Sequence, residues 1–205
     1  MSRPAFLTPQ ADVKRRKICP EDPRDLAFRI NMDHVAELFP QQDISVGTSR
    51  HLLFASLRMV AVLGRARTWY VDGTFKPVKE PFAQLFSVHA FVDSERATKQ
   101  GPLAFVLMSS RRRSDYEAVF NTLPAPLPGL PSVTHIVADF EAAAWQALQI
   151  VVPMVQIGGC LFHFTQAVSR KIQELGLRVA YNQDATDISD LVPALTDLIT
   201  YVRTQ

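Results

Sequence analysis

Three apolar runs rich in valine, phenylalanine and tyrosine follow one another between residues 68 and 110. They read TWYVDGTF, FAQLFSVHAFV and LAFVLMSS, and the turn-prone segments KPVKEP and DSERATKQGP separate them. Short apolar runs of this composition, bounded by turn signals, are typical of β-strands. Three such strands in succession predict an antiparallel meander, around which the rest of the chain must be arranged.

Strand and helix patterns alternate after the meander. SDYEAVFNTL begins with Ser114 and Glu117 at the spacing of a capping box, which predicts the start of a helix. A fourth strand, VTHIVADF, then precedes the helical EAAAWQALQIV, and a fifth strand, MVQIGG, precedes the helical CLFHFTQAVSRKIQELG, which should end near Gly176. This order predicts a mixed α/β fold of the ribonuclease-H-like type, in which parallel crossovers extend the meander.

The segments outside this core divide the chain further. Residues 1–23 are predicted to form a flexible basic arm, whose cluster at 14–17 (KRRK) is a nuclear-import signal, a phosphate contact or a solvated charge run. Residues 24–64 are interpreted as a helical segment, because apolar residues recur at spacings of three and four. The core is placed at 65–182, and 183–205 is interpreted as an amphipathic C-terminal helical remnant.

Composition narrows the classes of protein to which this chain can belong. With 47% apolar residues, the chain of 205 residues can bury one sizeable core. The net charge of +2 provides no strong global field, so nucleic acid would have to bind to local patches. We expect a soluble intracellular protein, because the sequence shows no signal peptide, no uninterrupted spanning segment and too few cysteines for a disulfide framework. We also expect no nucleotide cofactor, because no glycine-rich phosphate loop follows any strand.

Two acidic residues end apolar strand runs. Asp72 ends the first strand of the meander and Asp139 ends the fourth strand, which in this fold returns beside the first. Neighbouring carboxylates repel one another unless a cation lies between them, and oxygen ligands suit Mg²⁺ or Mn²⁺. Such a pair can hold metal ions that act on phosphodiesters. The alternative is that Asp139 only caps the next helix and Asp72 only forms a turn. His89, inside the second strand, is interpreted as a core histidine rather than a neighbour of a metal.

Three motifs in this order resemble those of the Mutator-like element (MULE) transposase domain. They are W-x-x-D-G-T-F at 69–75, D-x-E-x-A at 139–143 and C-x-F-H-x-x-Q-A at 160–167, and the resemblance extends over about residues 50–182. It implies a ribonuclease-H-like fold with an Asp-Asp-Glu metal site that cuts and joins DNA strands. Asp72 and Asp139 fall on the first two of these acids, with Mg²⁺ or Mn²⁺ as the implied cofactor.

The third acid is not assigned. In the family it follows a long, mainly helical insertion, whereas this sequence ends at Gln205, Glu174 lies too early, and Glu141 is expected to point away along its helix. The resemblance therefore implies a domain truncated before the third acid, with weak or absent DNA cleavage and transfer by itself. The alternative is a non-enzymatic nuclear module, derived from a transposase, that binds DNA or another partner.

Cys160 and His163 form a C-x-x-H pair. From the residues alone, the pair is either half of a zinc site or a buried thiol beside a satisfied histidine. Completion of a zinc site by Cys19 with His34 or His51 has no motif support. The resemblance implies a family signature near the metal centre, where His163 contacts a phosphate or makes an active-site hydrogen bond.

Several basic side chains are candidates for phosphate contacts, and a solvated surface is the alternative for each. The arginine trio at 111–113 could instead be held by Asp115 and Glu117. DNA is the expected partner, a homo-oligomer is left open, and the nucleus is the expected location, with the cytoplasm as a second one. The candidates for DNA contact are Arg111, Arg112, Arg113, Arg170 and Lys171.

Overall fold

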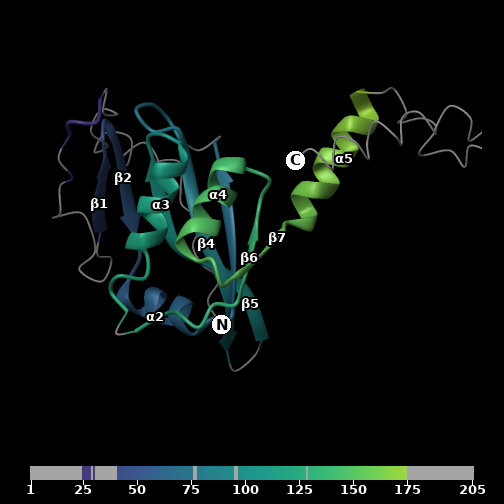
Figure 1. Ribbon diagram of the computed structural model, residues 1–205, viewed down its shortest axis with the longest axis horizontal. Coiled ribbons are helices and arrows are strands. Elements are labelled where there is room, and N and C mark those ends of the chain that lie inside the picture. The colour runs from purple at the N-terminus through teal and green to yellow at the C-terminus, as the bar shows by residue number, and fades with distance from the viewer. Residues whose placement is uncertain are drawn as a thin grey trace, which may run out of the picture.

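A computed structural model describes residues 25–28, 30, 41–75, 78–94, 97–127 and 129–174. Within these ranges, seven strands form a single mixed sheet in the order β1-β2-β5-β4-β3-β6-β7, accompanied by four helices (Figure 1). The predicted basic arm at 1–23, the predicted helix end at Gly176 and the predicted helical remnant at 183–205 lie outside the described residues.

The predicted meander is present at the centre of the sheet. It consists of β3 (Thr68–Thr74), β4 (Gln84–Ser94) and β5 (Ala97–Met108), and β4 pairs antiparallel with both neighbours. Buried and partly exposed residues alternate along β3 and the second half of β5, so one face of the sheet is buried against helices.

Parallel strands extend the meander, as the sequence predicted. β6 (His135–Ala138) pairs parallel with β3, and β7 (Gln156–Gly159) pairs parallel with β6. The connections contain α3 (Arg113–Thr122) and α4 (Ala142–Val151), which lie side by side on the sheet. The prediction of a mixed α/β fold compatible with the ribonuclease-H-like type is confirmed.

The helical interpretation of residues 24–64 is wrong for its central part. Residues 41–54 form a hairpin of β1 (Gln41–Val46) and β2 (Ser49–Phe54), with Gly47 at φ 57° in the turn. β2 pairs with the outer edge of β5, so the backbone groups of that edge find partners. The open edge of the meander thus decides the structure of a segment whose apolar spacing also suits a helix.

The helix that follows this hairpin is shorter than predicted. α2 (Leu57–Arg65) begins after Ser56, whose hydroxyl accepts a hydrogen bond from the backbone N–H of Met59 at 3.2 Å. This contact is a helix N-cap of the usual kind. The helix therefore starts well inside the segment 24–64 that the sequence pattern predicts to be helical.

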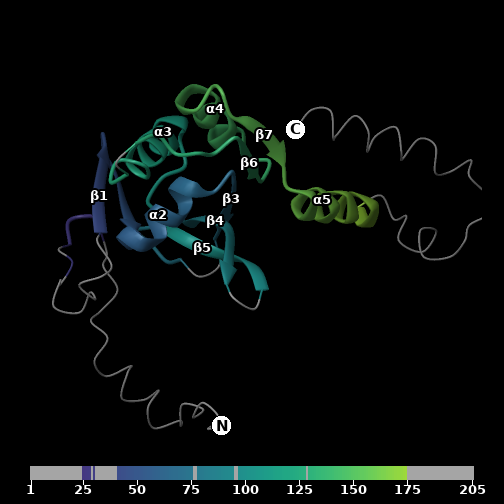
Figure 2. The ribbon, with the colours of Figure 1, turned by 90° about the horizontal axis from the view of Figure 1, so that it is seen from below.

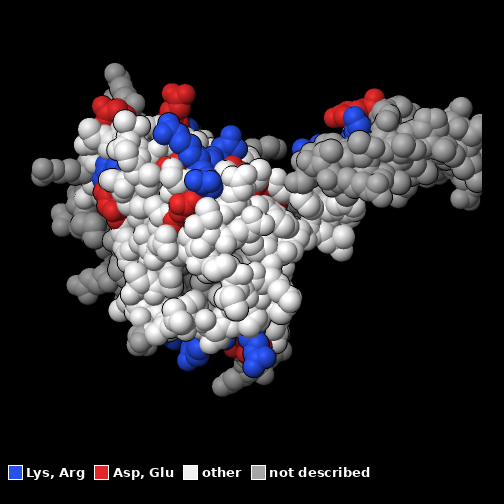
Figure 3. Space-filling model, viewed as in Figure 1, with Lys and Arg blue, Asp and Glu red and all other residues white. Residues whose placement is uncertain are grey.

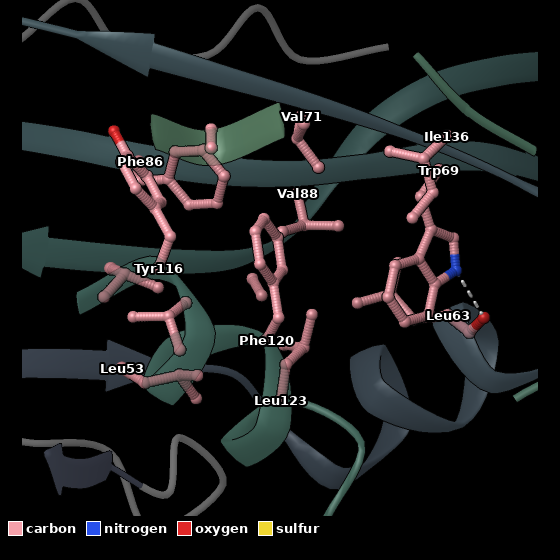
Figure 4. Close-up of a cluster of buried hydrophobic side chains, with 14 of the residues drawn as sticks. Leu53, Leu63, Trp69, Val71, Phe86, Val88, Tyr116, Phe120, Leu123 and Ile136 are labelled. Carbon is pink, nitrogen blue, oxygen red and sulfur yellow. Dashed lines mark hydrogen bonds between the residues drawn. The ribbon is translucent and has the colours of Figure 1, made fainter. Parts of the chain in front are cut away.

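The core lies between the sheet and the helices α2, α3 and α4, which cover the same face (Figures 1 and 2). Phe86 of β4 meets Tyr116 and Phe120 of α3 edge to face, at ring-centre distances of 5.4 and 5.7 Å. Trp69 of β3 donates a hydrogen bond from Nε1 to the carbonyl of Leu63 in α2, at 2.9 Å (Figure 4). These aromatic contacts join the meander to its helical layer.

The opposite face of the sheet is more open in the part of the chain that the structure describes. Tyr70 of β3 is partly exposed and meets Phe91 of β4, which is 50% exposed. α5 (Leu161–Glu174) leads away beyond β7 and buries none of its residues (Figures 1 and 2). None of the described helices is long and apolar enough to cross a membrane.

A buried histidine joins the unpredicted hairpin to α3. Nε2 of His51 in β2 lies 3.1 Å from Oδ1 of Asp115, and both side chains are almost fully buried. The other carboxylate oxygen of Asp115 accepts the backbone N–H of Arg112 at 2.8 Å. The predicted capping box of Ser114 and Glu117 is therefore wrong, because α3 starts after Arg112 and Asp115 makes the capping contact.

The protein should lose stability as the pH falls below about 6.5. Burial lowers the pKa of His51, against the opposing effect of Asp115. The unfolded chain therefore takes up this proton more readily than the folded chain, so stability is present above the unfolded pKa of about 6.5 and is lost below it. Urea midpoints measured from pH 7.5 to 5.5 should fall less in His51→Gln than in the parent. His135→Gln, which replaces an exposed histidine, should not change the fall, and an unchanged fall in His51→Gln would contradict this account.

Candidate metal centre

Asp72 and Asp139 lie at the carboxyl ends of neighbouring parallel strands. Val71 of β3 pairs with Ala138 of β6, so the next residue on each strand is one of the two acids. A Cβ atom built on Gly73 would lie 3.9 Å from Oδ2 of Asp139, which shows how closely this carboxylate approaches the end of β3. The structure therefore brings the two predicted acids together at one edge of the sheet, where ligands commonly bind in sheets with parallel strands.

An open cleft of about 1040 Å³ extends over this edge. This volume is similar to that of the larger ligand-binding sites in proteins. One wall comes from the strand ends and the start of α4, and the other comes from α5. The side chains that bear on function are those of Asp72, Phe75, Arg111, Asp139, Glu141, His163 and Arg170.

The electrostatics of Asp139 favour a nearby cation. Burial raises the pKa of Asp139 above its usual value, and the negative charges of Glu141 and Asp72 raise it further. The backbone N–H of Glu141 and the charge of His163 act in the opposite direction. A bound divalent cation would offset both the desolvation and the repulsion of this carboxylate.

Asp72 has an unsatisfied oxygen at the same place. Its Oδ1 is buried and makes no hydrogen bond among the described residues, although Nε2 of His163 lies 3.4 Å away. Its Oδ2 accepts a hydrogen bond from Oγ1 of Thr74 at 3.4 Å. A buried carboxylate oxygen without a full partner is costly, and a cation that takes oxygen ligands would satisfy it. The residues present thus fit Mg²⁺ or Mn²⁺.

A complete metal ligand set is not found in the described ranges, where no group of three His, Cys, Asp or Glu side chains is placed to hold an ion. The zinc site considered for Cys160 and His163 therefore gains no further ligand from these ranges. Cys19 and His34 lie outside the described residues, and His51 belongs to the contact with α3. His163 instead lies beside Asp72, the position at which an active-site contact was expected from the resemblance.

Glu141 lines the same cleft, which corrects the expectation that it points away along its helix. It occupies the N-cap position of α4, and its Oε2 accepts a hydrogen bond from the hydroxyl of Tyr116 at 2.8 Å. That hydroxyl accepts a hydrogen bond from Nε2 of Gln84 at 2.5 Å, and both Tyr116 and Gln84 are fully buried. A chain of hydrogen bonds therefore holds the Glu141 carboxylate at the cleft.

Gly73 leaves room for this chain of hydrogen bonds. A Cβ atom at residue 73 would lie 2.8 Å from Oε1 of Gln84, closer than real Cβ atoms approach other heavy atoms. Sequence reasoning missed Gln84 and Tyr116. A polar residue at the start of the otherwise apolar second meander strand was the available signal for Gln84.

The arginine trio does not act as a unit. The Arg111 guanidinium lies over the ring of Phe75, 4.8 Å from its centre, and Nη1 is 3.8 Å from Oε1 of Glu141 at the cleft. Arg112 is the N-cap residue of α3, and Nε of Arg113 pairs with Glu117 at 2.9 Å. Of the three, Arg111 alone lines the cleft.

The other predicted basic residues are on α5. Arg170 lines the cleft, whereas Nζ of Lys171 lies 3.5 Å from Oε2 of Glu174. On the face shown in Figure 3, charged side chains gather at the upper and lower edges of the folded body, and the middle is largely uncharged. Among the described residues visible on this face, charges of both signs are mixed at these edges rather than forming one broad basic patch.

His89 differs from its expected role as a core histidine. It lies half-buried on the more open face of the sheet, where burial lowers its pKa against the effect of Asp72. Its Nε2 is 2.9 Å from Oγ of Ser87. Together with Cys160, it lines a second pocket of about 560 Å³ beside the cleft.

The model of the MULE transposase domain matches residues 68–167. The match begins at β3, ends within α5 and includes both acids of the cleft. This region is a MULE transposase domain. The domain relates the chain to DNA transposition and implies interaction with DNA. No curated protein and no solved structure matches the chain.

Gly73→Ala should destabilise the MULE transposase domain by about 1–3 kcal/mol, because the new methyl group displaces the pinned Gln84 side chain and strains its bond to Tyr116. Urea unfolding followed by circular dichroism measures this change. Gly101→Ala is the matched control, since Gly101 also lies in a meander strand and a Cβ atom there meets nothing within 4 Å. Equal stability of the two variants would contradict the proposed close packing at Gly73.

Proposed function

We propose that this domain binds Mg²⁺ or Mn²⁺ with Asp72 and Asp139 and takes part in metal-dependent cleavage and transfer of DNA strands. The observation that carries the proposal is the parallel pairing of β3 with β6, which sets the two acids side by side in an open cleft. The unsatisfied Oδ1 of Asp72 and the raised pKa of Asp139 support the same assignment.

Each side chain at the cleft has its own role in the proposed reaction. Asp72 and Asp139 would hold the cation, which when bound supplies positive charge to phosphodiester oxygens and activates an attacking hydroxyl or water. Arg111, stacked on Phe75, presents its guanidinium to a phosphate at the rim. His163 lies beside Asp72 and orients its carboxylate in the cleft.

We infer that strand cleavage by these 205 residues alone is weak or absent. Two carboxylates hold a divalent cation loosely, and the described ranges contain no group of three metal-binding side chains. Glu141 is held by Tyr116 and Arg111 rather than directed as a third ligand. Its negative charge acts on the site by raising the affinity for a cation.

Asp139→Asn should stabilise the metal-free protein at pH 7 and remove its response to Mn²⁺. The pKa of Asp139 is raised in the folded state, so its charge costs stability as the pH rises above the unfolded value of about 3.8. The neutral amide lacks this cost and is a poor metal ligand. Thermal unfolding with and without Mn²⁺ measures both effects, and the ion should stabilise the parent but not Asp139→Asn.

Asp93→Asn is the control, because Asp93 lies in the β4–β5 hairpin and bonds to Thr98 away from the cleft. It should keep the full response to Mn²⁺. An equal response in Asp139→Asn would refute the metal site. Plasmid nicking provides the test of activity: rapid Mg²⁺-dependent nicking by the parent that Asp72→Ala abolishes would establish the site and contradict the inference of weak catalysis.

A non-enzymatic DNA-binding module is the second candidate function. The observation that favours it is that Arg111 and Arg170 line an open cleft of about 1040 Å³ and offer two positive charges there, independently of any metal. We also propose a nuclear location, since the substrate of either function is DNA. The basic cluster at 14–17 that would support nuclear import lies outside the described residues.

For this second function, Arg111→Ala should weaken DNA binding and reduce the salt slope by about one, because one phosphate contact is lost. Arg113→Ala should change little, since Arg113 pairs with Glu117 away from the cleft. Fluorescence anisotropy with a duplex oligonucleotide at several salt concentrations measures both variants. Binding that persists in Asp139→Ala favours the non-enzymatic module, and equal effects of the two arginine variants would argue against the cleft as the DNA site.

A further inference from the structure

A second pocket of about 560 Å³ adjoins the carboxylate cleft. Its floor is the more open face of the sheet, with Tyr70 of β3 directly opposite His89 of β4. Its other wall is the start of α5, including Phe162 and His163. The cleft and this pocket share two residues, Asp72 and His163, so a ligand can occupy both at once.

Aromatic rings from both the sheet and α5 line this pocket. Tyr70 is held edge to face against Phe91, at a ring-centre distance of 5.5 Å. Phe162 of α5 is 62% exposed and meets the His163 ring edge to face, also at 5.5 Å. Exposed aromatic rings next to a site for phosphate chemistry suit stacking with a planar ligand.

Neutral polar groups complete the lining. The pocket includes the amide of Gln100 and the thiol of Cys160, together with the imidazole of His89. Such groups can donate hydrogen bonds to, and accept them from, the edge of a heterocycle. The volume exceeds what a single planar base needs, and the carboxylate of Asp72 at its border disfavours a bare phosphate there.

We propose that this pocket holds one unstacked nucleobase of the DNA strand whose phosphate lies at the Asp72 and Asp139 cleft. This inference rests on the proposed action on DNA, and it adds that the DNA is unpaired where it meets the pocket. In a duplex the bases are stacked and paired, so a base reaches the pocket from a single strand or after leaving the helix. The domain therefore binds single-stranded DNA through a base as well as through phosphates.

The experiment compares two single-stranded 15-mers, one with thymine at every position and one fully abasic, by fluorescence anisotropy at low salt. The parent chain should bind the thymine strand about tenfold more tightly, because base stacking on aromatic side chains adds to phosphate contacts. Phe162→Ala should abolish this preference, and Phe162→Trp, which keeps an aromatic ring, should retain it. Met154→Ala, at a 93% exposed residue that lines neither the cleft nor the pocket, is the control and should bind like the parent.

The outcomes separate this inference from the proposed function. Equal affinity for the two strands overturns the base pocket, while salt-sensitive binding of both still supports contact between the cleft and DNA. A preference for thymine that survives in Phe162→Ala also overturns the pocket as described. Binding of neither strand, by a chain that is folded by circular dichroism, overturns the base pocket, and the duplex binding measured for the second candidate function decides that function separately.

Discussion

The parallel pairing of β3 with β6 is the constraint on which the candidate site depends. Val71 and Ala138 are paired within the sheet, and the buried Trp69 and Ile136 anchor the same two strands against the helical layer. Because side chains alternate between faces, a shift of one residue in this register would move an acid to the opposite face of the sheet. The packing of apolar residues therefore sets the distance between two carboxylates that would otherwise repel one another.

The site also lowers the stability of the fold locally. Asp139 is desolvated beside two other carboxylates, and Oδ1 of Asp72 is buried without a hydrogen bond among the described residues. The hydrogen bonds from Gln84 through Tyr116 to Glu141 keep the third carboxylate from relaxing into solvent. Sites that store unfavourable charge in this way are typical of functional centres, where a ligand supplies the missing compensation.

Much of the sheet could be predicted from the sequence, whereas its free edge could not. The meander and the two parallel strands have clear strand patterns and turn signals, and each occurs in the structure. The sequence pattern predicts a helix where the hairpin of β1 and β2 forms, because the spacing of its apolar residues is compatible with the period of a helix as well as with that of a strand. The segment forms a hairpin rather than a helix because β2 pairs with the edge of β5, which would otherwise be unpaired. The start of α3 was misplaced for a similar reason, since Asp115 is held by His51 of that hairpin as well as by its own helix.

The sequence by itself determined which residues end the central strands, and so identified Asp72, Asp139 and the motifs of the MULE transposase domain. Only the tertiary structure decided that Glu141 faces the cleft, that Arg111 is separated from Arg112 and Arg113, and that His89 lies on the open face. The physical reason is that local patterns report backbone preference and burial along one segment. The direction of a side chain at a site depends on partners such as Tyr116 and Phe75, which reach it from other elements of the fold.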